Sequence, residues 1–271
     1  MKIAFLGGGN MAGALIGGLL AKGYAADAIS VVEVFAQARD TLSARYKVHV
    51  SEAPDARTFA SDTLVLAVKP QDMRGAVAPL AGKLHGQVVV SIAAGIRLED
   101  LARWLGGYTR LVRVMPNTPA LIGAGVAGLY AGPDISAEER SRAEAILAAV
   151  GKTVWVEDEA LIDPVTAVSG SGPAYVFYFI EALEKAGVSL GLAPQPARAL
   201  AIQTFVGAAR LADESPESPG TLRERVTSKG GTTEAALKVF AAEDLAGAIG
   251  KALKAASDRG AELGRQLGKE A

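Results

Sequence analysis

The sequence predicts an α/β fold in which a doubly wound sheet is followed by an all-helical domain. Two observations support this prediction. Short apolar runs alternate with helical patterns up to about residue 157, and no β-rich run follows that point. Strands that alternate with helices are typical of parallel sheets with helices on both faces. We therefore expect one domain over residues 1–157 and a second over residues 158–271.

The first apolar run, Ile3 to Leu6, is followed by three glycines and then by apolar residues at helical spacing. Strand, glycine turn and helix in this order are the context of the dinucleotide-binding fingerprint. Gly7 permits a tight turn, Gly9 lets the backbone approach a pyrophosphate, and Ala12 lets the helix lie against the strand. The first N–H groups of the helix would face the phosphates. The turn therefore predicts a dinucleotide-binding site in the N-terminal domain.

The same stretch has two other interpretations. Lys2 and the uncharged run from Ile3 to Ala21 could form a signal peptide or a membrane span. Six glycines in that run disfavour a long helix. A glycine cluster after four apolar residues suits a strand that ends in a turn. A GxGxxA pattern is also common by chance, so this stretch alone leaves the cofactor site open.

The composition excludes several classes of function. Lys and Arg number 28 against 29 acidic residues, so the chain lacks the basic character of nucleic-acid or anionic-membrane binders. No cysteine is present, which excludes disulfides and zinc–sulfur sites; we expect no metal and a cytoplasmic location. His49 and His85 lie in no suggestive context, so we expect chemistry that does not depend on histidine.

Further strands and helices are predicted in order along the first domain. Helices are expected over residues 36–46, 98–105 and 137–150, the last capped by Ser136. Strands are expected over residues 29–34, 48–50, 63–68, 88–93, 110–115, 125–130 and 153–156. Ligands of such sheets bind outside the carboxyl ends of the strands. Here those ends are the first glycine turn and residues 67–70, 93–95 and 115–119.

The second domain reads as helices. Residues 169–173 resemble a loop that enters a helix with Pro173 in its first turn, and residues 213–220 resemble another loop. The run from Ala174 to Ile180 is continuously apolar, so its helix must be covered on every side. A subunit interface would supply that cover.

A second stretch with chemical character lies at residues 226–237, where two glycines and two threonines precede a helix. In one interpretation Thr232 or Thr233 caps this helix, and Glu234 suits its positive end. In the other, the bare N–H groups of Gly230 and Gly231 hold a small carboxylate. The residues alone leave both open.

Six ordered blocks together resemble the Δ1-pyrroline-5-carboxylate reductase family. They are LGGGNMA (6–12), LAVKPQDM (66–73), SIAAG (91–95), VRVMPNTP (112–119), SGSGPAYV (169–176) and VTSKGGTTEAAL (226–237). The resemblance implies a Rossmann-like domain followed by an all-helical dimerisation domain, in a homodimer or a larger homo-oligomer. It also implies NADPH- or NADH-dependent reduction of the cyclic imine 1-pyrroline-5-carboxylate to L-proline, the last step of proline biosynthesis.

The resemblance also implies roles for individual residues. Thr233 matches the threonine whose hydroxyl meets the ring nitrogen. The residues that match the carboxylate-binding segment are Ser228, Gly230, Gly231 and Thr232. The residues that match cofactor contacts are Leu6, Gly7, Gly8, Gly9, Asn10, Met11, Ala67, Val68, Lys69, Pro70, Ala93, Ala94 and Gly95. An imine can enter already protonated, so such a site needs no strong side-chain acid.

The preferred nucleotide stays open. Glu33 lies at the end of the second predicted strand, where an acidic side chain commonly binds the ribose 2′-hydroxyl of NAD and repels the 2′-phosphate of NADP. Glu33 could also be an exposed strand-end charge. Arg39 could reach a 2′-phosphate or lie in solvent on its helix.

Two rival functions remain. A β-hydroxyacid dehydrogenase would need a catalytic lysine, and neither Lys185 nor Lys229 lies in the glycine-rich helix context which that family uses. A non-enzymatic nicotinamide sensor would have no reason for the stretch at 230–233.

Overall fold

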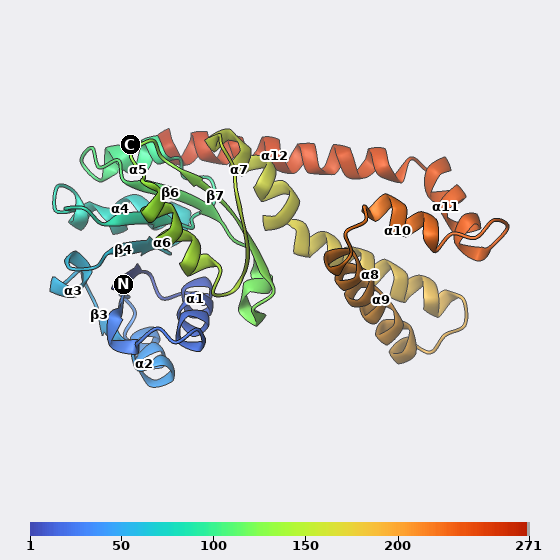
Figure 1. Ribbon diagram of the computed structural model, residues 1–271, viewed down its shortest axis with the longest axis horizontal. Coiled ribbons are helices and arrows are strands. Elements are labelled where there is room, and N and C mark those ends of the chain that lie inside the picture. Colours follow the sequence, from blue (N-terminus) through green and yellow to red (C-terminus); the bar gives the residue numbers. More distant parts are fainter. Residues whose placement is uncertain (270–271) are drawn as a thin grey trace. The chain divides into compact units, whose positions relative to one another are not determined.

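The computed structural model describes residues 1–269 and contains two compact units. The first unit contains Met1–Ser171 together with the described residues from Lys254 to Lys269, and the second contains Gly172–Leu253. Figure 1 shows a sheet with helices in the first unit and helices alone in the second. No strand follows Trp155 within the described part of the chain, which confirms the α/β and all-helical division.

The first unit is built on one eight-stranded sheet with the order β3-β2-β1-β4-β5-β6-β7-β8. Every neighbouring pair is parallel except β6 and β7. The strands are β1 (Ile3–Leu6), β2 (Ile29–Val32), β3 (His49–Ser51), β4 (Thr63–Leu66), β5 (Val88–Ser91), β6 (Leu111–Met115), β7 (Gly125–Ala131) and β8 (Gly151–Trp155).

The antiparallel pair departs from the expectation of parallel pairing. Val112 pairs with Ala131 and Met115 with Gly128. Only the 3₁₀ helix η4 (Thr118–Ile122) lies between these strands. A parallel return needs a crossover of about a dozen residues or more, usually with an α-helix. The short connection therefore turns β7 back along β6.

Helices cover both faces of the sheet, because alternate residues of each strand point to opposite faces. Ile3 and Phe5 of β1 belong to one buried cluster, and Ala4 and Leu6 belong to the other. The helices of this unit are α1 (Asn10–Ala21), α2 (Ala36–Tyr46), α3 (Ala56–Phe59), α4 (Met73–Val77), α5 (Leu98–Trp104), α6 (Ala137–Leu147) and α7 (Ile162–Val165). The expected cap of α6 is confirmed, since Ser136 Oγ accepts a hydrogen bond from Glu139 N.

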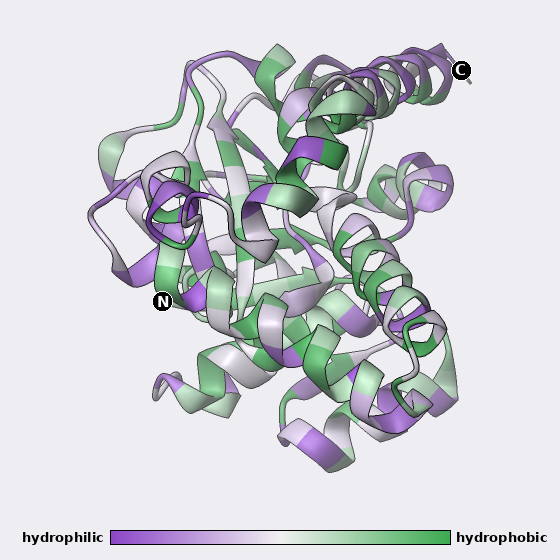
Figure 2. Ribbon diagram, turned by 90° about the vertical axis from the view of Figure 1, so that its right-hand side faces the viewer, coloured by the Kyte–Doolittle hydropathy of each residue, from purple (hydrophilic) through white to green (hydrophobic). Residues whose placement is uncertain are grey.

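The second unit contains α8 (Gly172–Ser189), α9 (Pro194–Glu214), α10 (Pro219–Arg225) and α11 (Thr232–Ala242). The long helix α12 (Leu245–Lys269) begins in this unit and ends in the first. Figure 2 shows hydrophobic residues between hydrophilic ones along the helices. Within residues 1–269, no helix combines the length and the apolar character that a bilayer crossing requires.

One detail differs from the expectations. Where we expected a loop over residues 169–173, the π-helical turn η6 (Thr166–Gly170) leads almost directly into α8, which begins at Gly172. The domain boundary between residues 157 and 158 stays a prediction; the two compact units divide the chain between Ser171 and Gly172, with Ile162 and Ala167 buried in the first unit. Gly264 of α12 is buried there as well.

Candidate active site

Three strand ends meet at Gly7, which follows β1. Gly7 N donates to Val32 O of β2 over 2.8 Å, and Ala67 N donates to Leu6 O over 2.8 Å. Gly7 has φ +98°, and a Cβ there would lie 2.8 Å from Ala67 O. Only glycine combines this backbone conformation with so close a contact.

The next two glycines, Gly8 and Gly9, differ in their surroundings. A Cβ on Gly8 would lie 2.4 Å from Leu42 Cδ1, so a side chain there would have to displace the buried Leu42 of α2. Gly9 has no such neighbour, because a Cβ there would meet nothing within 4 Å. Gly9 is the N-cap residue of α1 and makes no side-chain cap. The first N–H groups of α1 thus lie beside open space, which fits a bound pyrophosphate.

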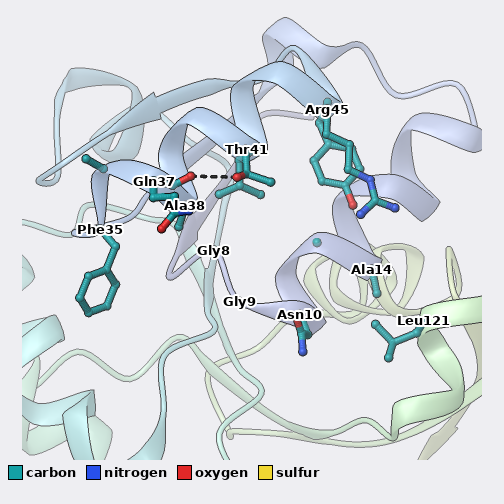
Figure 3. Close-up of a pocket in the computed structure, with 14 residues that line it drawn as sticks. Gly8, Gly9, Asn10, Ala14, Phe35, Gln37, Ala38, Thr41, Arg45 and Leu121 are labelled. Carbon is teal, nitrogen blue, oxygen red and sulfur yellow. Dashed lines mark hydrogen bonds between the residues drawn. The ribbon is translucent and has the colours of Figure 1, made fainter.

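This open space belongs to a cleft of about 770 Å³ between the glycine turn and α2. Figure 3 shows Gly8, Gly9 and Asn10 on one side of the cleft and residues of α2 on the other. Of the residues that line the cleft, sequence reasoning had named Gly8, Gly9 and Asn10 alone. Those that it missed include Phe35, Thr41, Arg45 and Leu121, of which Phe35 had the clearest signal because it stands two residues after Glu33.

Glu33 connects the two turns that border the cleft. Its side chain is buried, with 8% of the residue exposed, so the interpretation as an exposed strand-end charge is wrong. One carboxylate oxygen accepts from Gly8 N and the other from Phe35 N, each over 2.9 Å. The buried charge is therefore compensated by backbone N–H groups. A contact between Glu33 and the ribose stays a prediction.

Arg39 is held by the same region. Its Nη1 donates to Glu33 O and Val34 O, each over 2.8 Å. Its Nη2 lies 3.3 Å from a Glu52 carboxylate oxygen. The guanidinium thus ties the β2–α2 turn to the end of β3, so it does not lie free in solvent.

The other predicted nucleotide-binding residues follow β4 and β5. Because β1, β4 and β5 are parallel neighbours, their carboxyl ends share one edge of the sheet. Residues 67–70 follow β4, and Lys69 precedes the 3₁₀ helix η2 (Pro70–Asp72). Residues 93–95 follow β5, and Gly95 has φ +81°. The structure therefore brings these segments to the edge that carries the glycine turn.

The predicted substrate segment lies in the second unit, at the start of α11. Gly231 is the N-cap residue and no side chain caps the helix, so the interpretation of Thr232 or Thr233 as the cap is wrong. Gly230 N donates to a Glu234 carboxylate oxygen over 2.7 Å, and Gly231 N donates to Ser228 O over 3.0 Å. Both glycine N–H groups are thus used within the turn.

Because Gly230 N and Gly231 N already donate within the turn, a carboxylate bound at this segment needs other donors. The first N–H groups of α11 have no acceptor within the helix, and two threonine hydroxyls stand beside them. No cluster of three or more metal-binding side chains occurs among residues 1–269. The segment can hold a small anion and present a hydroxyl, with no metal from these residues.

Comparisons with known proteins match both units. The family described as NADP oxidoreductase, coenzyme F420-dependent, matches residues 2–95. The family described as pyrroline-5-carboxylate reductase dimerisation matches residues 159–263. The pyrroline-5-carboxylate reductase of Pseudomonas aeruginosa is 47% identical over 98% of each chain, and that of Haemophilus influenzae is 44% identical over 96% of this chain and 97% of the relative.

Solved structures of pyrroline-5-carboxylate reductases resemble this chain over nearly its whole length. A pyrroline-5-carboxylate reductase from Coxiella burnetii has a TM-score of 0.93 and 40% identity, covering 97% of this chain and 98% of that one. The Plasmodium falciparum pyrroline carboxylate reductase with NADP bound has a TM-score of 0.84 and 25% identity, with the same coverage.

Fold and site together define a nicotinamide-nucleotide-dependent oxidoreductase with a Rossmann-like domain, for which NADPH or NADH is the cofactor. More particularly, the chain belongs to the pyrroline-5-carboxylate reductase family.

Glu33→Ala tests both roles of this carboxylate. We expect kcat/KM to fall with NADPH and with NADH, because Gly8 N and Phe35 N lose their acceptors. We also expect the ratio of the two values to shift toward NADPH, since a negative charge near the 2′-phosphate position is removed. Steady-state kinetics with both nucleotides provides the measurement. If both values fall and their ratio stays constant, Glu33 only shapes the turn.

Proposed function

We propose that this protein reduces 1-pyrroline-5-carboxylate to L-proline with NADPH or NADH, as the last step of proline biosynthesis. The observation that carries the proposal is that the Thr233 hydroxyl is available to a ligand. Thr233 stands in the first turn of α11 and caps nothing, so its hydroxyl is available beside an open helix N-terminus. The chain also contains the nucleotide cleft that such a reduction needs.

The proposed mechanism assigns simple tasks to this chain's residues. The bound nucleotide supplies a hydride to the imine carbon. The Thr233 hydroxyl hydrogen-bonds the ring nitrogen, which keeps its proton and ends as the amine of proline. The N–H groups of Thr232 and Thr233, with the Ser228 hydroxyl, hold the substrate carboxylate. Positioning by such contacts removes several kcal/mol of the barrier without a side-chain acid.

The structure weakens the rival with a catalytic lysine. Lys185 is exposed on α8 and forms an ion pair with Glu181 one turn earlier. That hydrogen bond raises the pKa of Lys185 and keeps its charge at the surface. Such an i, i+4 pair is typical of a solvated helix face.

Oxidation of NADPH and NADH, followed by nicotinamide absorbance, tests the proposed function. We expect turnover with at least one nucleotide only when 1-pyrroline-5-carboxylate is supplied, and proline as the product. A 3-hydroxyacid with NAD⁺ or NADP⁺ provides the comparison for the dehydrogenase rival. Folded protein that binds nucleotide but turns over neither substrate would contradict both enzymatic functions and favour a sensor.

Thr233→Val removes one hydroxyl while it keeps the shape of the side chain. We expect kcat/KM to fall by about 10- to 100-fold, the effect of one lost hydrogen bond to a polar reacting group. The melting temperature should stay unchanged because Thr233 caps no helix. Thr204→Val is the matched control, since its hydroxyl donates to Leu200 O within α9. Wild-type kinetics in Thr233→Val would remove this residue from the mechanism.

We also propose that the protein works as a homodimer or a larger homo-oligomer, and its cytoplasmic location stays a prediction. No residue of α8 is buried within the chain, and Phe177 and Tyr178 are 66% and 69% exposed. Apolar side chains exposed in this way mark interfaces between proteins. A second copy would cover them, and two-fold dimers are the commonest arrangement.

Mixing two impaired variants tests whether the start of α11 in one subunit completes the nucleotide site of the other, as the resemblance to the family implies. Gly9→Val obstructs the open space beside the nucleotide turn, and Thr233→Val removes the catalytic hydroxyl. We expect the pair, unfolded and refolded together, to exceed the activity of either variant alone. Each heterodimer would then contain one intact site. No gain, with heterodimers verified by two affinity tags, would mean that each chain provides a whole site.

A further inference from the structure

The last part of α12 touches the turn that follows β5. Gly264 is buried, and a Cβ there would lie 2.7 Å from Gly95 O. From the other side, a Cβ on Gly95 would lie 3.5 Å from Gly264 N. The two backbones are therefore in direct contact, and only the missing side chain of Gly264 permits it.

Independent contacts hold α12 in this position. Arg103 Nη2 donates to Gly268 O over 2.7 Å and to a buried Asp100 carboxylate oxygen over 2.6 Å. Leu267 packs against the apolar cluster on this face of the sheet. Gly268 O is one of the last carbonyls of α12, which find no N–H partner within the helix, and the Arg103 side chain supplies the missing donor. α12 is thus anchored to α5 on one side while it touches Gly95 on the other.

The contact at Gly95, unlike the contacts at α5, restrains a segment of the predicted nucleotide site. Gly95 ends the segment 93–95 at the carboxyl edge of the sheet, which is the edge that binds nucleotides in such folds. The backbone of this segment can move only as far as α12 allows. A misplacement of about 1 Å in a site can cost about 100-fold in rate, so a change far along the chain can act there.

We propose that Gly264 is a positioning residue that sets the place of the Ala93–Gly95 turn and thereby the affinity for the nicotinamide nucleotide. The inference rests on the proposed function, because the family resemblance assigns this turn to the cofactor. The residue touches no reactant itself. It acts through the oxygen of Gly95.

Gly264→Ala tests this role, with Gly260→Ala as the matched control. Gly260 lies one turn earlier on the same helix, and a Cβ there would meet Asp163 Oδ1 at an ordinary 3.7 Å. We expect Gly264→Ala to raise the equilibrium Kd and the KM for NADPH about tenfold or more. The KM for the imine should change less than about twofold, and Gly260→Ala should bind NADPH like the wild type.

A third variant separates positioning from loss of stability. A Cβ on Gly268 would lie 2.4 Å from Asp100 Oδ2, so Gly268→Ala disturbs the anchor on α5 and not the turn at Gly95. We expect Gly268→Ala to lower the melting temperature with a smaller change in the Kd for NADPH. If the two variants raise the Kd only in proportion to their loss of melting temperature, or if Gly264→Ala binds NADPH like Gly260→Ala, the proposal is wrong.

The binding measurement needs no turnover. Wild-type protein that binds NADPH but does not reduce the imine would overturn the proposed function and leave the comparison of Kd values valid. Wild-type activity together with an unchanged Kd in Gly264→Ala would overturn only this inference.

Discussion

The close approach of Gly7 to Ala67 O is the constraint on which the nucleotide site depends. It brings the ends of β1, β2 and β4 together, through hydrogen bonds that join Gly7 to Val32 and Ala67 to Leu6. The strand order places β1 between β2 and β4, where the winding of the sheet changes direction. Ligands of doubly wound sheets bind at this switch point. A side chain at Gly7 would push these ends apart.

Glu33 connects the end of β1 to the turn that follows β2. Its buried carboxylate accepts one N–H from the β1–α1 turn and one from the β2–α2 turn, and so joins the two borders of the cleft. A carboxylate in such a place is tolerated because two N–H groups compensate the lost hydration. The glycine next to this bridge, Gly9, is left with open space on its exposed side. Open space beside the first N–H groups of a helix is what the phosphates of a nucleotide require.

The proposed chemistry explains why the predicted substrate segment needs only glycine, serine and threonine residues. Hydride transfer belongs to the cofactor, and a protonated imine needs orientation more than acid catalysis. A glycine turn with Glu234 holding Gly230 N gives the start of α11 a defined shape. The remaining N–H groups and the Thr233 hydroxyl suit a small anion with a ring nitrogen beside it. Neither histidine nor cysteine is needed for these tasks.

The sequence by itself determined the parts of this protein that local patterns encode. β1 and α2 have the predicted bounds, Ser136 caps α6, and the ordered motifs identify the family. Tertiary structure decided the rest: β7 turns back because its connection is short, Glu33 is buried by two turns, and α12 returns to Gly95. Hydrophobic periodicity and capping patterns depend on residues that are neighbours along the chain. A contact such as that of Gly95 with Gly264 joins distant segments, so no local window of sequence contains it.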